Sequence, residues 1–296
     1  LLPGGDLDEP DQLCLLGNVY AGASLYDRAE ETYKQAIAAD PDKPDAYTSL
    51  ARLYGNTGKS QEAIGVLERA LSRGLDDPRL RIEKASLLVL MGRAQEAKQI
   101  VSALQTQYPL QPRVHELMGL CLMSENNPQG AIEELTKEID YGGGGFVTFA
   151  ALGQAYLATG NYSEAADYLE KALALNPLST AVTSIAIQLA DAYTKLGYHY
   201  KACDVLSRIA RIDPGNIPVR FKLANCLYRA GRLEDAIKEF KQLHKFDPAN
   251  ADILVNLGTV YANMDSLDTA IELWRQALEI DPNNEMAKEN LRQARQ

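Results

Sequence analysis

The sequence predicts an all-α fold in which one pair of helices is repeated eight times. Two observations support this. Residues 10–284 repeat with a period of 34, with three extra residues at 180–182, and small residues recur at two fixed places of each period, flanked by apolar residues at helical spacing. Counted from Pro10, the repeats span 10–43, 44–77, 78–111, 112–145, 146–179, 183–216, 217–250 and 251–284.

The small residues predict where the two helices of a repeat cross. The twentieth residue is always alanine: Ala29, Ala63, Ala97, Ala131, Ala165, Ala202, Ala236 and Ala270. The eighth is always glycine or alanine: Gly17, Ala51, Ala85, Gly119, Gly153, Ala190, Ala224 and Gly258. Side chains of this size let two helix backbones approach closely.

Larger and turn-forming residues complete the pattern. Large apolar residues at the eleventh and twenty-fourth places, such as Tyr54 and Leu67, fill the space around the crossing. A glycine follows the first helix in five repeats, where a left-handed residue suits a helix C-terminus. Prolines then stop the second helix, at Pro41, Pro109, Pro177, Pro214, Pro248 and Pro282.

With these features the chain resembles a tetratricopeptide-repeat array over residues 10–284. The segments LLGNVYAGASLYDRAEETYKQAIAADP and NLGTVYANMDSLDTAIELWRQALEIDP fit that family's pattern closely. The resemblance implies an α-solenoid, a right-handed superhelix of antiparallel helix pairs, whose first helices line a concave groove. It also implies a non-catalytic scaffold that binds a peptide or helix of a partner protein in this groove.

The two ends of the array differ. Residues 1–9 are expected to be a linker or the remnant of an upstream region. Residues 285–296 are expected to form a capping helix, because Ala287, Leu291 and Ala294 share one face. The first helix, QLCLLGNVYAGA, is apolar around much of its circumference, so an upstream repeat, a domain or a second copy is expected to cover it. A homo-oligomer through this N-terminal edge is one such expectation.

In each first helix, the second, fifth, ninth, twelfth and thirteenth residues are predicted to face the groove. They form an apolar strip in repeats three to five and a polar, partly basic strip in repeats six to eight. The predicted partner-binding residues are Ile82, Val89, Leu120, Met123, Leu157, Lys195, Asn225, Arg229, Asn256 and Asn263, with Leu90 in the apolar strip and Lys222 beside the polar one. This pattern suits an amphipathic helix or an extended peptide with an acidic end; alternatively, the apolar residues contact one another.

No lysine stands at the fifth place of any repeat. The carboxylate clamp of the heat-shock co-chaperones, which belong to the family that the chain resembles, is therefore not expected.

Composition argues against several classes of function. A net charge of -10 and a pI near 4.9 disfavour binding to nucleic acid or anionic membranes, and no apolar stretch approaches the roughly 20 residues of a membrane span. Scattered cysteines and histidines predict no disulfide framework, no metal site and no cofactor. Unpaired cysteines favour the cytoplasm. Cys203 and Cys226 fall where neighbouring repeats pack, which predicts small buried side chains that lie near each other.

Two segments resemble catalytic motifs but fit the repeat better. LYGNTGKS has Leu53 in place of the first glycine of a phosphate-binding loop, and HELMG has Gly119 in place of the second histidine of a zinc protease motif. No catalytic residue is predicted. Two alternatives to a simple scaffold stay open: the partner-recruiting domain of a larger enzyme such as a glycosyltransferase, and a self-assembling structural scaffold.

The glycine run in YGGGGF is predicted to form the turn after repeat four. Its members are Gly142, Gly143, Gly144 and Gly145. Glu138 stands where four other repeats have alanine, and this substitution predicts a loosely packed joint. Together they predict a weak hinge between two halves of the chain, with a plain turn as the alternative. Gly143→Pro is expected to restore the usual helix stop.

Overall fold

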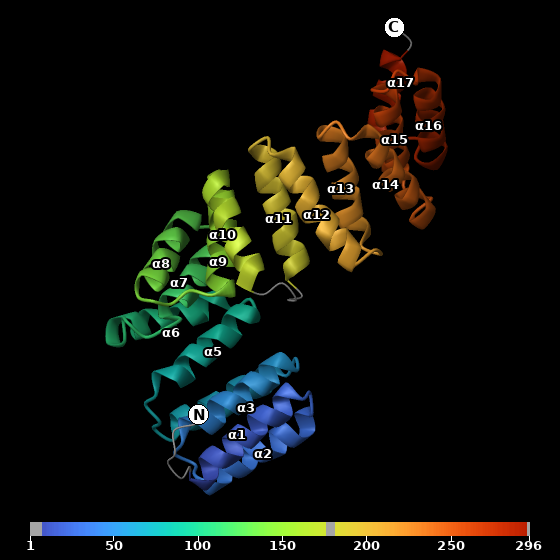
Figure 1. Ribbon diagram of the computed structural model, residues 1–296. Coiled ribbons are helices and arrows are strands. Elements are labelled where there is room, and N and C mark those ends of the chain that lie inside the picture. The colour runs from blue at the N-terminus through green and yellow to red at the C-terminus, as the bar shows by residue number, and fades with distance from the viewer. Residues whose placement is uncertain (1–7, 176–180, 295–296) are drawn as a thin grey trace. The chain divides into compact units, whose positions relative to one another are not determined.

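The computed structural model describes residues 8–175 and 181–294. These residues form 17 α-helices and no strand (Figure 1), so the predicted all-α fold is confirmed. The helices are α1 (Glu9–Gly22), α2 (Tyr26–Ala39), α3 (Pro44–Asn56), α4 (Ser60–Ser72), α5 (Pro78–Leu90), α6 (Ala94–Gln107), α7 (Val114–Ser124), α8 (Pro128–Asp140), α9 (Phe146–Ala158), α10 (Tyr162–Leu175), α11 (Val182–Lys195), α12 (His199–Ile212), α13 (Ile217–Arg229), α14 (Leu233–Phe246), α15 (Ala251–Ala262), α16 (Leu267–Ile280) and α17 (Glu285–Gln293).

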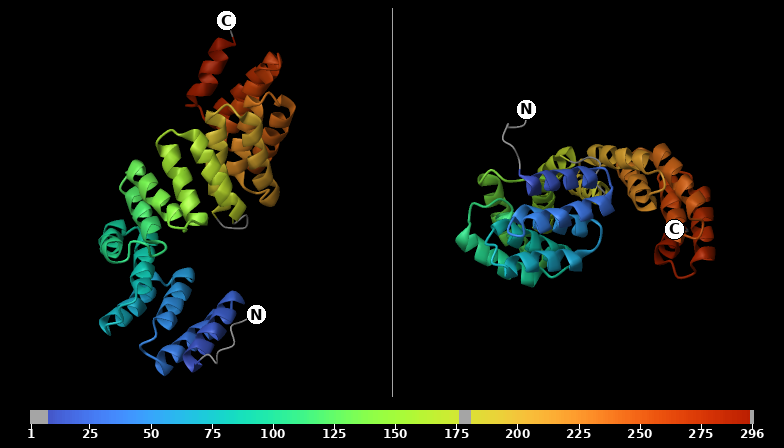
Figure 2. Two further views of the ribbon diagram at one scale, coloured as in Figure 1. Left: turned by 60° about the vertical axis from the view of Figure 1, so that its left-hand side comes forward. Right: turned by 90° about the horizontal axis from the view of Figure 1, so that it is seen from below.

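The chain divides into two compact units, unit 1 (Leu1–Ala151) and unit 2 (Leu152–Gln296), and the division falls inside α9. We call the odd-numbered helices α1 to α15 first helices and the even-numbered ones second helices. Within each unit the helix pairs stack in chain order (Figure 2). Successive first helices also contact one another, from α1 to α7 in unit 1 and from α11 to α15 in unit 2. Each unit is therefore an α-solenoid.

Where the first helix has a glycine at the crossing, it lies close against a large residue of the second helix. A Cβ atom added to Gly119 in α7 would lie 2.5 Å from Cγ of Leu135 in α8. A Cβ added to Gly258 in α15 would lie 2.5 Å from Nε1 of Trp274 in α16, which donates a hydrogen bond to the Val255 carbonyl. Real Cβ atoms do not come this close, so only glycine fits without a shift of the packed partner.

The glycine run forms a hydrogen-bonded turn between α8 and α9. Gly142 (φ 81°) and Gly144 (φ 107°) adopt a left-handed backbone that other residues rarely take. The N–H group of Gly143 donates to the Glu138 carbonyl at 2.9 Å. A Cβ at Gly143 would lie 2.8 Å from that carbonyl oxygen and closer still to Oε1 of Glu138. The expected restoration of the helix stop by Gly143→Pro is therefore wrong, because proline would lose this donor and collide with α8.

Glu138 ties α8 to the start of α7 instead of loosening the joint, which corrects the sequence-based expectation. Its side chain is buried. Oε1 accepts from the backbone N–H of Arg113 at 2.7 Å, and Oε2 accepts from the backbone N–H of Glu116 at 3.1 Å. Arg113, the N-cap of α7, has a left-handed φ of 74° and makes no side-chain cap, so Glu138 supplies that cap. The hinge at Gly142–Gly145 stays a prediction, and these glycines lie within unit 1.

Replacing Glu138 with alanine is expected to lower the free energy of unfolding by about 1–2 kcal/mol, because two N–H groups at a helix start lose their acceptor. Glu133→Ala removes an exposed acid from the same helix and is expected to change it by less than about 0.5 kcal/mol. Urea denaturation followed by circular dichroism measures both. An unchanged or raised midpoint for Glu138→Ala would show that the position accepts alanine as the other repeats do.

Candidate functional site

The first helices of unit 1 carry a row of ion pairs across their shared face. Arg79 of α5 pairs with Asp45 of α3 at 2.5 Å. Nε of Arg52 in α3 donates to Glu83 of α5 at 2.8 Å, and Nη1 of Arg113 donates to the same carboxylate oxygen at 3.0 Å. The Glu83 carboxylate is buried, and burial of a charge is tolerated only with partners of this kind. The charges on this face therefore largely neutralise one another.

The same face is hollowed between α1, α3 and α5. One cavity of about 450 Å³ is lined by residues that include Asp11, Cys14, Asn18, Asp45 and Arg79. A neighbouring cavity of about 330 Å³ lies between α1, α2 and α3; its lining also contains Asn18 and includes Tyr26 and Tyr33 of α2 and Asn56 of α3. These linings mix charges, amides and rings but hold no paired nucleophile and base.

In unit 2 the predicted polar residues share one face of α11, α13 and α15. Lys222 of α13 pairs with Asp191 of α11 at 2.8 Å, and the side-chain amide of Asn263, the C-cap of α15, donates to the Tyr228 hydroxyl of α13 at 2.7 Å. These bonds bridge successive first helices. We call the surface formed by Asp191, Lys195, Lys222, Asn225, Arg229, Asn256 and Asn263 the polar face of unit 2.

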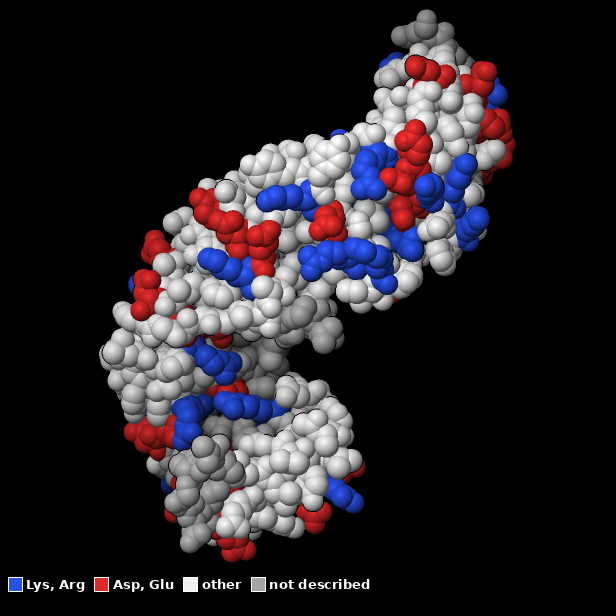
Figure 3. All heavy atoms as spheres, in the orientation of Figure 1, with Lys and Arg blue, Asp and Glu red and all other residues white. Residues whose placement is uncertain are grey.

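Two cations on the polar face have no ion-pair partner among the described residues, unlike Arg52, Arg79 and Arg113 in unit 1. Lys195 and Arg229 are exposed and occupy equivalent ends of α11 and α13. Neither forms an ion pair with a residue in the ranges 8–175 and 181–294. Basic and acidic side chains alternate over α10 to α14 (Figure 3), and residues 217–250 hold seven bases and four acids. A negatively charged ligand would meet these two cations without breaking an existing ion pair.

The asparagines of the polar face bond to their own helices. The side-chain amide of Asn225 donates to the Phe221 carbonyl at 3.1 Å, and that of Asn256 donates to the Asp252 carbonyl at 2.7 Å. A carbonyl four residues back also accepts the regular helix bond, so it stays satisfied when the side chain turns away. Both amides can therefore turn to a ligand at low cost.

The predicted apolar strip is only partly accessible. Ile82 is 4% exposed and belongs to the core of unit 1, so its prediction as a groove residue is wrong. The half-buried members are Val89, Leu120, Met123 and Leu157. Val89 and Leu120 pack against that core, whereas Leu90 at the end of α5 is 78% exposed. Leu90 is the apolar side chain of the strip that a partner would reach first.

The N-terminal helix exposes apolar residues that other repeats bury. Val19 of α1 is 65% exposed, while Leu53, at the same place in α3, is 5% exposed. Leu16 is likewise exposed and its counterpart Leu50 is buried. Helix α3 also contacts α1 and α2 of the preceding helix pair, whereas no helix precedes α1 among the residues that the structure describes.

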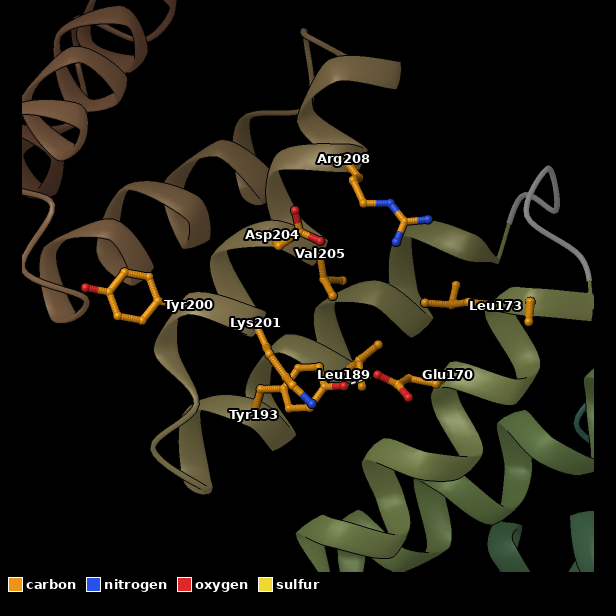
Figure 4. A pocket seen from close by; sticks show the side chains of 10 residues that line it. Glu170, Leu173, Leu189, Tyr193, Tyr200, Lys201, Asp204, Val205 and Arg208 are labelled. Carbon is orange, nitrogen blue, oxygen red and sulfur yellow. Dashed lines mark hydrogen bonds between the residues drawn. The ribbon is translucent and has the colours of Figure 1, made fainter.

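The sequence pattern gave no signal for an outer cavity of about 690 Å³ in unit 2 (Figure 4). It opens between the second helices α10 and α12, with Leu173, Leu189 and Val205 among its lining residues. The Tyr193 hydroxyl donates to Glu170 across it. Burial and this carboxylate raise the pKa of Tyr193, so the hydroxyl stays protonated. The lining comes from three helices of two neighbouring pairs, α10, α11 and α12, which a one-repeat pattern does not encode.

The described residues contain no group of three or more His, Cys, Asp or Glu side chains placed to hold a metal ion. None of the described helices combines the length and apolar character needed to cross a membrane.

Family models match most of the repeats seen in the structure. Models of the tetratricopeptide repeat match residues 20–81, 56–121, 148–179 and 251–284, and a model described as TPR repeat matches residues 224–265. The chain belongs to the tetratricopeptide-repeat (TPR) family. None of the curated proteins matches the sequence of this TPR chain.

Solved structures share the TPR fold. YrrB, described as a TPR protein with an unusual peptide-binding site, is 23% identical with a TM-score of 0.56, over 64% of this chain and 96% of YrrB. The C-terminal part of a TPR repeat-containing protein from Cytophaga hutchinsonii is 17% identical with a TM-score of 0.61, over 82% of this chain and 99% of that one. MamA is 21% identical with a TM-score of 0.50, over 56% of this chain and 95% of MamA. These similarities concern the fold.

Proposed function

We propose that this TPR chain is a non-catalytic interaction scaffold whose first helices bind an extended acidic segment of a partner protein. The observation that carries the proposal is the exposure of Lys195 and Arg229 on the polar face of unit 2, without an ion-pair partner among the described residues. The peptide-binding site named for YrrB supports this use of the fold.

The polar face offers two kinds of contact. The two cations would pair with carboxylates of the bound segment. The amides of Asn225 and Asn256 would leave the carbonyls of their own helices and bond the main chain of that segment, which fixes its path without requiring a particular sequence. The two cations would then set the preference for acidic segments, and the two amides would set the position of the bound main chain along the polar face.

Unit 1 offers a different contact. Its ion pairs satisfy one another, so a ligand gains little by adding charge there. The exposed Leu90 side chain provides the apolar contact instead. Leu90→Asp probes this contact better than Leu120→Glu, because Leu120 packs against the core and a charge there would also destabilise the fold.

Peptides selected from a random display library by the intact chain are expected to be rich in Asp and Glu. The double variant Lys195→Glu with Arg229→Glu is expected to weaken binding of a selected peptide at least about tenfold, because two attractions become repulsions. Fluorescence anisotropy measures the affinity, and added salt should weaken binding to the unaltered chain.

The matched control is Arg211→Glu with Lys245→Glu, which makes the same charge change on exposed residues of the second helices α12 and α14. Its affinity should stay within about twofold of the unaltered chain. An equal loss in the control would show that overall charge, and not the polar face, attracts the peptide. Selection of peptides without acidic residues would contradict the proposal directly.

A second candidate function, self-assembly through α1, is favoured by the exposed Leu16 and Val19. If α1 joins two copies, light scattering of the unaltered chain gives a dimer. The variant Val19→Glu is then expected to be a monomer, because dimer formation would bury the new carboxylate in the contact. Ile212→Glu, at an exposed apolar residue of α12, should leave the dimer intact. A monomer at high concentration of the unaltered chain would contradict this candidate.

A further inference from the structure

Two cysteine thiols meet at the junction between α12 and α13. Sγ of Cys203 in α12 lies 2.6 Å from Sγ of Cys226 in α13, only about half an ångström beyond the length of a disulfide bond. Both cysteines are free and buried, with 1% and 6% of their surfaces exposed. The other two, Cys14 and Cys121, belong to unit 1. The pair is thus arranged for a bond between two neighbouring helix pairs.

The surroundings of the pair favour one thiolate. The hydrogen bond with Cys226 lowers the pKa of Cys203 against the opposing effect of burial, and the guanidinium of Arg232 lowers it further. The pKa of Cys226 is raised by the same hydrogen bond and by burial. Cys203 is therefore the thiol of the pair that loses its proton more easily. A thiolate next to a thiol is the reactive arrangement for oxidation.

We propose that Cys203 and Cys226 are a modification site, at which a peroxide drives formation of a reversible disulfide. The Cys203 thiolate attacks one peroxide oxygen, the O–O bond breaks, and the departing hydroxide takes a proton and leaves as water. The sulfur of Cys226 then attacks the sulfenic sulfur and gives up its proton to the departing hydroxyl, so that the S–S bond forms and a second water leaves. Two thiols are oxidised and one hydrogen peroxide is reduced to two waters. A dithiol reductant reverses the bond by thiol–disulfide exchange.

The disulfide would fix α13, a helix of the polar face, against α12. It joins residues 23 positions apart and encloses the turn between α12 and α13. Because α13 also carries Asn225 and Arg229, the bond would hold the helix that bears two residues of the polar face. Closing this loop restricts the unfolded chain and so stabilises the folded one. The inference does not depend on the proposed partner binding.

The test treats the folded, full chain with hydrogen peroxide, blocks the remaining thiols with iodoacetamide after denaturation, and maps tryptic peptides without reduction. Peptides 202–208 and 223–229 each hold one member of the pair. We expect them to be linked within one chain, while Cys14 and Cys121 are alkylated. The midpoint of thermal unfolding should rise by about 5 °C and return after treatment with dithiothreitol.

Cys226→Ser should abolish both the linked peptide and the thermal shift, whereas Cys121→Ser, at a buried cysteine of unit 1, should keep both. If Cys226→Ser does not fold, the peptide map and the melt of the unaltered chain still decide. The inference is overturned if both Cys203 and Cys226 are found alkylated, which would show that they stayed reduced during the peroxide treatment. It is equally overturned if Cys203 ends as a sulfinic or sulfonic acid, or if it pairs with Cys14 or another chain.

Discussion

The fold depends on close contacts between a small residue of a first helix and a large residue of the second helix in the same pair. Gly119 on Leu135, Gly153 on Leu169 and Gly258 on Trp274 all bring the helices so close that no Cβ atom fits between them. This contact fixes the distance and angle within a pair. Stacking of equal pairs then places successive first helices side by side, and the shared face that we propose as a binding surface is a consequence of that stacking.

The first helices of unit 1 and unit 2 carry different surface chemistry on the same fold, because the crossing within a helix pair uses only residues that point inward. In unit 1 the outward residues pair with one another, as Arg52 and Arg113 do with Glu83. In unit 2 the equivalent surface leaves Lys195 and Arg229 without ion pairs among the described residues. Packing sets the spacing of these side chains, and their chemistry can change without a cost to the core. A scaffold of this kind can alter its ligand preference one repeat at a time.

The helix pairs were predictable from sequence because one register recurs eight times, and chance does not produce alanine at the same place in every repeat. The contacts of individual side chains were not. Glu138 looked like a misplaced charge because its acceptor role depends on two N–H groups at the start of α7, the other helix of its own pair. Ile82 was placed in the groove by its helical position, yet the neighbouring helices bury it. The Cys203–Cys226 approach was foreseen as proximity, whereas its distance depends on how α12 and α13 pack.

Alanine substitution at two glycines of unit 1 tests the dependence on close crossing most directly. Gly119 lies at the crossing of α7 and α8, whereas a Cβ at Gly65 in α4 would meet nothing within 4 Å. Gly119→Ala is expected to lower the free energy of unfolding by about 1–3 kcal/mol through overpacking, and Gly65→Ala to raise it by about 0.5–1 kcal/mol through helix propensity. Urea unfolding measures both values. Equal stabilisation by the two alanines would contradict the close crossing.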